Sequence, residues 1–233
     1  MGRFTMAYGS FVDRTDEVLI LVRKASQIER SEHAFGRGRE IDALCRGAIV
    51  LLSSHLEAYV KELGECLLDA MFAKSVCRSK LGDSFFYHAS RRSLDGIRKE
   101  TDPKKVSENV FEFVDRQSDL WSKTGSFPRR IDSEEFNKGF SNPKVEKIQR
   151  YLSRFGYQSL RHDLNVTLRG ECVVTIATID QIVETRNAIA HGEASATKTP
   201  AEVNEMVASA QIFCRTVDGT FATWSKEKLC AIR

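Results

Sequence analysis

Residues 46–60 read Arg-Gly-Ala-Ile-Val-Leu-Leu-Ser-Ser-His-Leu-Glu-Ala-Tyr-Val, and this stretch decides the fold class of the chain. It lies in a longer window, about residues 38–73, in which apolar side chains recur every three or four positions: Ile41, Cys45, Ala48, Leu52, Leu56, Tyr59 and Leu63. That period predicts an α-helix with one buried face. The helix would be roughly 50 Å long, a length typical of the central helix of a bundle.

Upstream and downstream of this window the pattern is also helical. Apolar residues flanked by charges predict a first helix over about residues 11–30. Asp102-Pro103 and Asn142-Pro143 each look like an N-cap followed by proline at the first helical position. They predict helices near residues 103–122 and 143–155.

The last third of the chain predicts two more helices. One covers residues 171–191, with Ile176, Ile179, Val183 and Ala190 on its apolar face. The other follows Thr199-Pro200-Ala201-Glu202, which has the pattern of a capping box. Strand signals are nearly absent, so we predict an all-α, up-and-down helical bundle. It forms a single domain over residues 1–233, with a basic and more irregular helical insert at about 75–170.

Composition is that of a globular protein with one ample core, since 42% of its 233 residues are hydrophobic and 29% are charged. The net charge is +3, but residues 75–170 hold 19 Lys and Arg against 13 Asp and Glu, and the remainder holds 16 against 19. The basic middle is compatible with a surface that faces phosphates. The modest charge density equally fits an ordinary solvated surface of mixed charge.

The six cysteines include no C-x-x-C pair, and none stands near a histidine at metal-ligand spacing. We therefore expect buried thiols in a reducing cytoplasm, and neither a metal nor another cofactor. The start of the chain lacks the pattern of a signal peptide. The longest apolar run, residues 48–52, is far too short to span a bilayer, so no membrane association is expected.

One short stretch points to a chemistry: Glu184-Thr185-Arg186-Asn187-Ala188-Ile189-Ala190-His191-Gly192. An arginine fork can grip a phosphate and stabilise charge in a transition state, and an imidazole can exchange protons near neutral pH. A second interpretation is structural. Gly192 can end the helix in a left-handed conformation, and the helix dipole favours a histidine beside it by about 0.3–1 kcal/mol.

The helical geometry of this stretch matters. Asn187 and His191 are four residues apart and share a face, whereas Arg186 lies about 140° from His191. One helix therefore does not readily close Arg186 onto His191. A two-fold dimer would bring the polar groups of both copies into one cleft.

These residue types favour RNA cleavage. The attacking group would be the ribose 2′-hydroxyl, with His191 as general acid and base, Arg186 as phosphate binder and Asn187 as a positioning group. This reaction requires no metal, and the sequence shows no carboxylate cluster of the kind that two-metal nucleases use.

Three segments resemble one family in the same order along the chain. Arg186-Asn187-x-x-x-His191 resembles the R-x4-6-H signature of HEPN domains. Residues 46–60 resemble the long second helix of the RiboL-PSP type of HEPN proteins, and the segment from Asn142-Pro143 to Phe155-Gly156 resembles the segment before its motif helix. The resemblance covers about residues 40–220.

The resemblance implies an all-α homodimer with its active cleft at the interface, and a metal-independent endoribonuclease that serves as a toxin or phage-defence effector. It implies catalytic roles for Arg186 and His191, a supporting role for Asn187, and RNA and an antitoxin or defence protein as partners. HEPN toxins paired with small nucleotidyltransferases carry a tyrosine two residues after the histidine. Glu193 stands there, which disfavours such a partner. The alternatives are a non-catalytic HEPN module that binds RNA or a protein, and a helical dimerisation domain.

Other candidates accompany the motif. His55 and Glu57 on the long helix, and Glu184 before the motif, are candidate neighbours of the cleft, although His55 also fits the apolar stripe as a core histidine. Several arginines are candidates for binding RNA phosphates: Arg129, Arg130, Arg150, Arg154 and Arg161.

Overall fold

A computed structural model of the chain describes residues 4–31 and 36–233. Within these ranges the regular structure is helical and includes no β-strand, so the all-α prediction is confirmed. The helices in chain order are α1 (Met6–Glu29), α2 (Gly38–Ala73), η1 (Arg78–Lys80), α3 (Asp83–Ala89), α4 (Arg91–Lys99), α5 (Pro103–Trp121), α6 (Ser133–Asn137), α7 (Val145–Leu152), η2 (Ser153–Phe155), α8 (Leu160–Leu168), η3 (Arg169–Glu171), α9 (Cys172–Ala190) and α10 (Pro200–Lys228).

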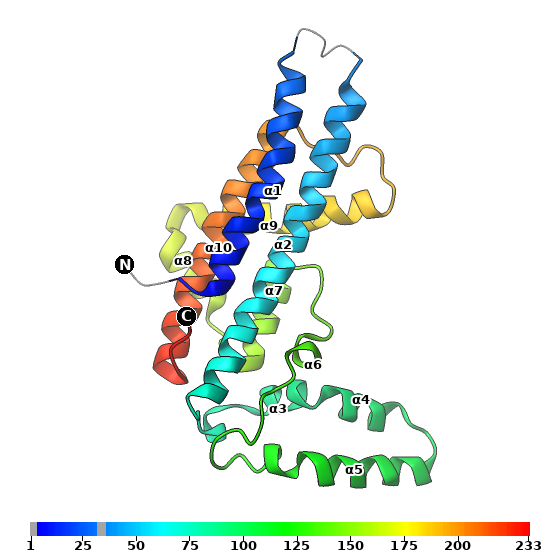
Figure 1. Cartoon of the computed structure of the whole chain (residues 1–233), viewed down its shortest axis with the longest axis vertical. Coiled ribbons are helices and arrows are strands. Elements are labelled where there is room, and N and C mark those ends of the chain that lie inside the picture. Colours follow the sequence, from blue (N-terminus) through cyan, green and yellow to red (C-terminus); the bar gives the residue numbers. More distant parts are fainter. Residues whose placement is uncertain (1–3, 32–35) are drawn as a thin grey trace.

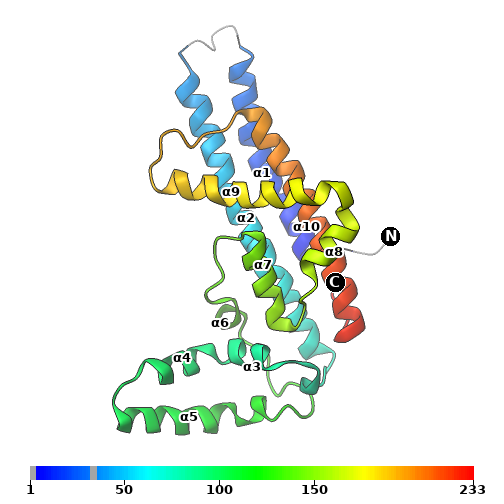
Figure 2. The same ribbon diagram turned by 180° about the vertical axis from the view of Figure 1, so that it is seen from behind.

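Three long helices form the body of the molecule. Figure 1 shows α1, α2 and α10 running roughly along the long axis. Figure 2 shows α9 lying across α2 and α10 on the face away from α1. The predicted bounds of the long second helix are confirmed, and Thr199 and Glu202 form the predicted capping box at the start of α10. No helix within the described ranges combines the length and apolarity needed to cross a membrane.

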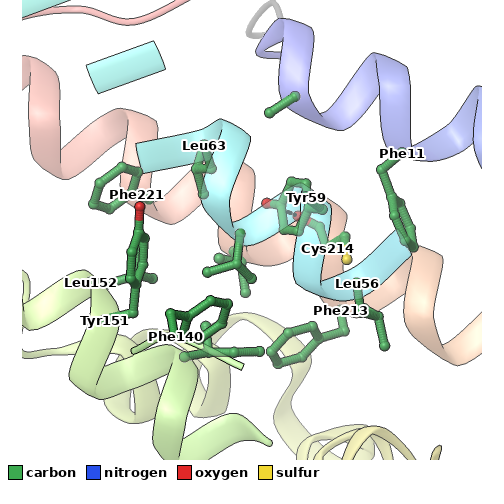
Figure 3. Packing of buried hydrophobic residues seen from close by; sticks show 14 of the residues in the cluster. Phe11, Leu56, Tyr59, Leu63, Phe140, Tyr151, Leu152, Phe213, Cys214 and Phe221 are labelled. Carbon is green, nitrogen blue, oxygen red and sulfur yellow. Dashed lines mark hydrogen bonds between the residues drawn. The ribbon is translucent and has the colours of Figure 1, made fainter. Parts of the chain in front are cut away.

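The core between these helices is rich in aromatic side chains (Figure 3). Tyr59 of α2 is fully buried beside Phe11 of α1, and its hydroxyl donates a hydrogen bond of 2.9 Å to the carbonyl of Cys214 in α10. Since a buried polar group without a partner would cost about 1–3 kcal/mol, this bond makes the tyrosine compatible with the core.

A glycine lets α7 approach α2. A Cβ atom at Gly64 would lie 2.0 Å from the hydroxyl oxygen of Tyr151 in α7, so no larger residue fits there without a shift. The Tyr151 hydroxyl donates to Asn137 in α6, which in turn donates to Glu65 of α2 at 2.7 Å. This contact fixes the C-terminal end of α7, together with α6, against the C-terminal half of α2.

The predicted insert divides into parts with different surroundings. Helices α4 and α5 form an arm that projects from the body (Figure 1). No residue of α4 is buried, and in α5 only Leu120 is. Phe111 on the arm is 76% exposed. In contrast, α7 and α8 contribute to the main core through Tyr151, Leu160 and other residues.

Two details of the sequence prediction are wrong. Ala190 was expected on the apolar face of the helix now seen as α9, but it is exposed because α9 extends beyond the helices it packs on, and the buried side is formed by Cys172, Thr175, Ile179, Ile182 and Val183. The predicted helix over 143–155 starts at Val145 and tightens into a 3-10 turn at Ser153–Phe155.

His88 in α3 gives the fold a predicted sensitivity to acid. Burial, together with Arg154 and Arg91, lowers the pKa of its imidazole to about 4, whereas an imidazole in an unfolded chain titrates at about 6.5. The neutral ring therefore stabilises the fold fully above about pH 6.5, and this contribution is lost as the pH falls toward about 4. The loss is on the order of 2–3 kcal/mol.

We expect His88→Phe to flatten the fall in unfolding free energy between about pH 7 and pH 4.5, measured by urea denaturation. His162→Phe, which replaces an exposed imidazole, is the control and should keep the pH dependence of the parent protein. Equal pH dependence in both variants would contradict the assignment.

Candidate functional site

The site begins where α9 ends. Gly192 has a φ of +79°, and the Glu193 and Gly192 N–H groups donate at 3.0 Å to the carbonyls of Ala188 and Ile189. This pair of bonds is a Schellman motif, so the backbone alone caps the helix. The His191 ring is exposed and makes no hydrogen bond within the described residues. The cap thus leaves the imidazole free to meet a ligand.

Arg186 is partly buried and held by two amide oxygens. Its Nη1 group donates to Asn142 Oδ1 at 3.3 Å and to Asn187 Oδ1 at 3.0 Å. The second bond turns the guanidinium toward the flank of α9 that carries Asn187, one turn before His191. Arg186 and His191 leave the helix about 140° apart, but the Arg186 guanidinium turns back toward the side of α9 that carries His191.

Neutral partners have an electrostatic consequence for Arg186. A carboxylate would offset the arginine charge, whereas two amide oxygens orient the guanidinium and leave the charge available to an anion. The Nε and Nη2 groups make no protein hydrogen bond in the part of the chain that the structure describes. Those free donors match the bidentate geometry with which arginine binds a phosphate.

Asn142 is the residue that the sequence interpretation assigned to the wrong role. It was expected to cap α7, but the N-cap is Lys144, and the first helical N–H, that of Val145, is bound by Asp180 of α9 at 2.8 Å. Asn142 has a φ of +53°, a left-handed conformation that costs energy for a residue other than glycine. In this conformation its side chain binds Arg186 and does not cap the first N–H groups of α7.

Glu57 of α2 binds the backbone of the loop that carries Asn142. Its Oε2 atom accepts from the Asn142 backbone N–H at 3.3 Å, and its Oε1 atom lies 2.7 Å from Lys61 Nζ. Glu57 was a predicted neighbour of the cleft, and it lies two hydrogen bonds away from Arg186.

Glu184 lies on α9 itself and makes an ion pair beside the motif. It pairs with Lys144 at 2.6 Å, and this bond raises the pKa of the Lys144 ammonium. The pair joins the start of α7 to the motif helix two residues before Arg186. Of the predicted neighbours of the cleft, Glu184 therefore lies beside the motif.

The expectation that His55 lies near the cleft is wrong. His55 is 9% exposed and faces α1, where its Nε2 atom lies 3.5 Å from Glu17. The reason is the helical repeat, since His55 and Glu57 point about 200° apart on α2. Burial lowers the pKa of the His55 imidazole, as expected of a core histidine.

The predicted phosphate-binding arginines do not gather around Arg186. Arg154 is 8% exposed, donates to the Phe136 carbonyl and stacks 4.9 Å from the Tyr151 ring centroid, so it serves the core. Arg130 pairs with Asp69, Arg150 with Glu146, and Arg129 binds the Arg116 carbonyl and Gln117. Arg161 is exposed on α8. These arginines lie on several different parts of the fold, and within the described residues none of them makes a hydrogen bond or ion pair with the motif.

The outward side of α9 is apolar in its N-terminal half and mixed further along the helix. Val173 and Val174 are 76% and 67% exposed, and the stripe continues toward His191 through Ala177, Gln181 and Ala188. Positions 173, 177, 184 and 191 fall within about 40° of one another on a helical wheel. His191 therefore ends an exposed stripe, which Lys144 contacts through its ion pair with Glu184.

A family model described as RiboL-PSP-HEPN matches residues 10–223. The match spans the motif helix, the loop at Asn142 and the long helix α2. No curated protein and no solved structure gave a significant match.

Proposed function

This chain belongs to the RiboL-PSP-HEPN family, and on that premise we propose that it is a metal-independent endoribonuclease. It cleaves RNA by attack of a ribose 2′-hydroxyl on the adjacent phosphate. The observation that carries the proposal is the pair of neutral amide oxygens on Arg186, because they aim the guanidinium without neutralising it.

Each residue of the site has a role in this reaction. Arg186 binds the phosphate through its free donors and stabilises the charge that develops on the phosphorane. His191 removes the 2′-hydroxyl proton or protonates the leaving 5′-oxygen. Asn187 and Asn142 are positioning residues, since both act through Arg186.

The proposed enzyme is a homodimer with its cleft between the copies. The exposed stripe of α9 supports this arrangement, because its N-terminal half is apolar and exposed, with Val173 and Val174, and the stripe leads to His191. A two-fold axis would place the same stripe of both copies together and bring both motif ends to one groove.

We expect Val174→Asp to dissociate this dimer, since a carboxylate in an apolar interface would lose its hydration without gaining a partner. Sedimentation velocity should show a shift from dimer to monomer, with at least a tenfold weaker dimerisation constant (~1.4 kcal/mol or more). The control is Ile20→Asp, which alters an exposed apolar residue of α1. Helix α1 lies behind α2 and α10 as seen from α9 (Figure 2). A dimer of unchanged affinity would contradict the interface.

The activity itself is tested with purified protein and mixed RNA in EDTA. Cleavage that leaves 2′,3′-cyclic phosphate ends supports the proposal, and a DNA strand of the same sequence should stay intact because it lacks the 2′-hydroxyl. RNA binding without cleavage would instead favour a non-catalytic HEPN module. We also propose a role as a toxin or defence effector in the cytoplasm, restrained by a protein partner, on the basis of the family resemblance of the motif.

A further inference from the structure

Three lysines surround the loop at residues 141–144 that holds Arg186. Lys61 reaches it from α2, since its partner Glu57 also accepts the Asn142 N–H. Lys144 stands at the start of α7 and pairs with Glu184. Lys147, one turn further, donates to the Ser141 carbonyl at 3.3 Å. Segments far apart in the sequence thus bring three ammonium groups to one loop.

These ammonium groups are accessible. The side chains of Lys61 and Lys144 are 32% and 37% exposed, and Lys147 is exposed as well. Glu184, the partner of Lys144, is a surface carboxylate, and such a pair contributes only about 0–1 kcal/mol. Lys147 binds only a backbone carbonyl, so a phosphate can replace the partner of either lysine at little cost. Lys61 keeps its bond to the partly buried Glu57, and its remaining N–H donors can bind a phosphate beside that carboxylate.

Resting on the RNA cleavage proposed above, we propose that Lys61, Lys144 and Lys147 bind the phosphates of single-stranded RNA on either side of the scissile bond. We name these three side chains the lysine cluster. A lysine binds phosphate as a point charge without a strict geometry, which suits neighbouring phosphates of a flexible strand. The cluster takes the place of the arginines that the sequence suggested.

The chemistry of the site favours a single strand over a duplex. Attack by a 2′-hydroxyl requires that oxygen to stand in line with the leaving 5′-oxygen, and stacked A-form nucleotides do not adopt this arrangement. Unpaired nucleotides can turn freely and present the phosphate to Arg186. Because phosphate contacts do not report the sugar, RNA and DNA should bind alike. Only RNA should be cleaved, since only RNA has the attacking 2′-hydroxyl.

The test measures binding without cleavage. In a His191→Ala background, a triple variant Lys61→Gln, Lys144→Gln and Lys147→Gln is titrated with a fluorescent unstructured RNA at several KCl concentrations. We expect Kd to rise at least tenfold at about 100 mM KCl and the slope of log K against log salt to fall by about 2, as three lost phosphate contacts require.

The matched control is Lys99→Gln, Lys104→Gln and Lys105→Gln, which removes three exposed lysines at the tip of the arm and changes the net charge equally. Its Kd should change less than about twofold, whereas equal losses in both variants would mean diffuse attraction and would overturn the proposal. Single-stranded DNA should bind within a few-fold of RNA. Duplex RNA that binds as well as the single strand would overturn the assigned substrate class.

The two proposals fail separately. Cleavage by the parent protein with unchanged binding in the lysine-cluster variant would overturn the lysine cluster and leave the ribonuclease in place. Loss of binding in that variant, with no cleavage by the parent protein, would support the lysine cluster and overturn the ribonuclease.

Discussion

Arg186→Ala is expected to lower the rate of RNA cleavage by about two to three orders of magnitude, the usual cost of removing one donor that stabilises transition-state charge. The loss should appear mainly in kcat, because the developing negative charge on the phosphorane exceeds that of the substrate phosphate. Single-turnover cleavage of a short labelled RNA, with enzyme in excess, measures the chemical step directly.

Arg186→Lys tests the geometric part of this prediction. Lysine keeps the charge but cannot donate as a fork, so its activity should lie between those of the parent protein and Arg186→Ala. Circular dichroism should show the parental helix content in both variants. A fall in rate of less than about tenfold for Arg186→Ala would contradict its place in the site, since a transition-state contact costs more than that.

The long-range pattern of the fold could be predicted because periodicity reports which face of a long helix is buried. The bounds of α2 follow from the apolar periodicity of its residues, and the capping box at Thr199 follows from the spacing of Thr199 and Glu202. The short helices α3, α4, α6 and α8 were not predicted, since none of them offers more than three turns of pattern. Tertiary contacts rather than local signals determine their ends.

The candidate site was predictable only in part, for a similar reason. The motif on α9 could be found from residue types and spacing, but Asn142 could not, because an Asn-Pro pair is also a common helix start. Its left-handed conformation and its bond to Arg186 are tertiary features. The signal that could have found it was the choice of asparagine, which tolerates positive φ better than most residues.

Mixed dimers carrying one Arg186→Ala chain and one His191→Ala chain should be active, although each variant alone retains little activity. In a cleft where Arg186 of one copy works with His191 of the other, such a dimer retains one intact site and one site that lacks both groups. Its rate should be about half that of the parent dimer. Two different affinity tags allow these mixed dimers to be purified before the cleavage assay.

The decisive control is a mixed dimer of one unaltered chain and one chain carrying both Arg186→Ala and His191→Ala. It carries the same two substitutions as the first mixed dimer, but both on one chain. If Arg186 of one copy works with His191 of the other, this dimer has no intact site. If Arg186 instead works with His191 of its own chain, the two activities are reversed: this second dimer keeps about half the rate and the first has none. Because the guanidinium turns toward the flank of Asn187 while the His191 ring ends the exposed stripe, the structure of one chain permits either pairing. The comparison therefore assigns the catalytic pair by activity, independently of how tightly the chains associate.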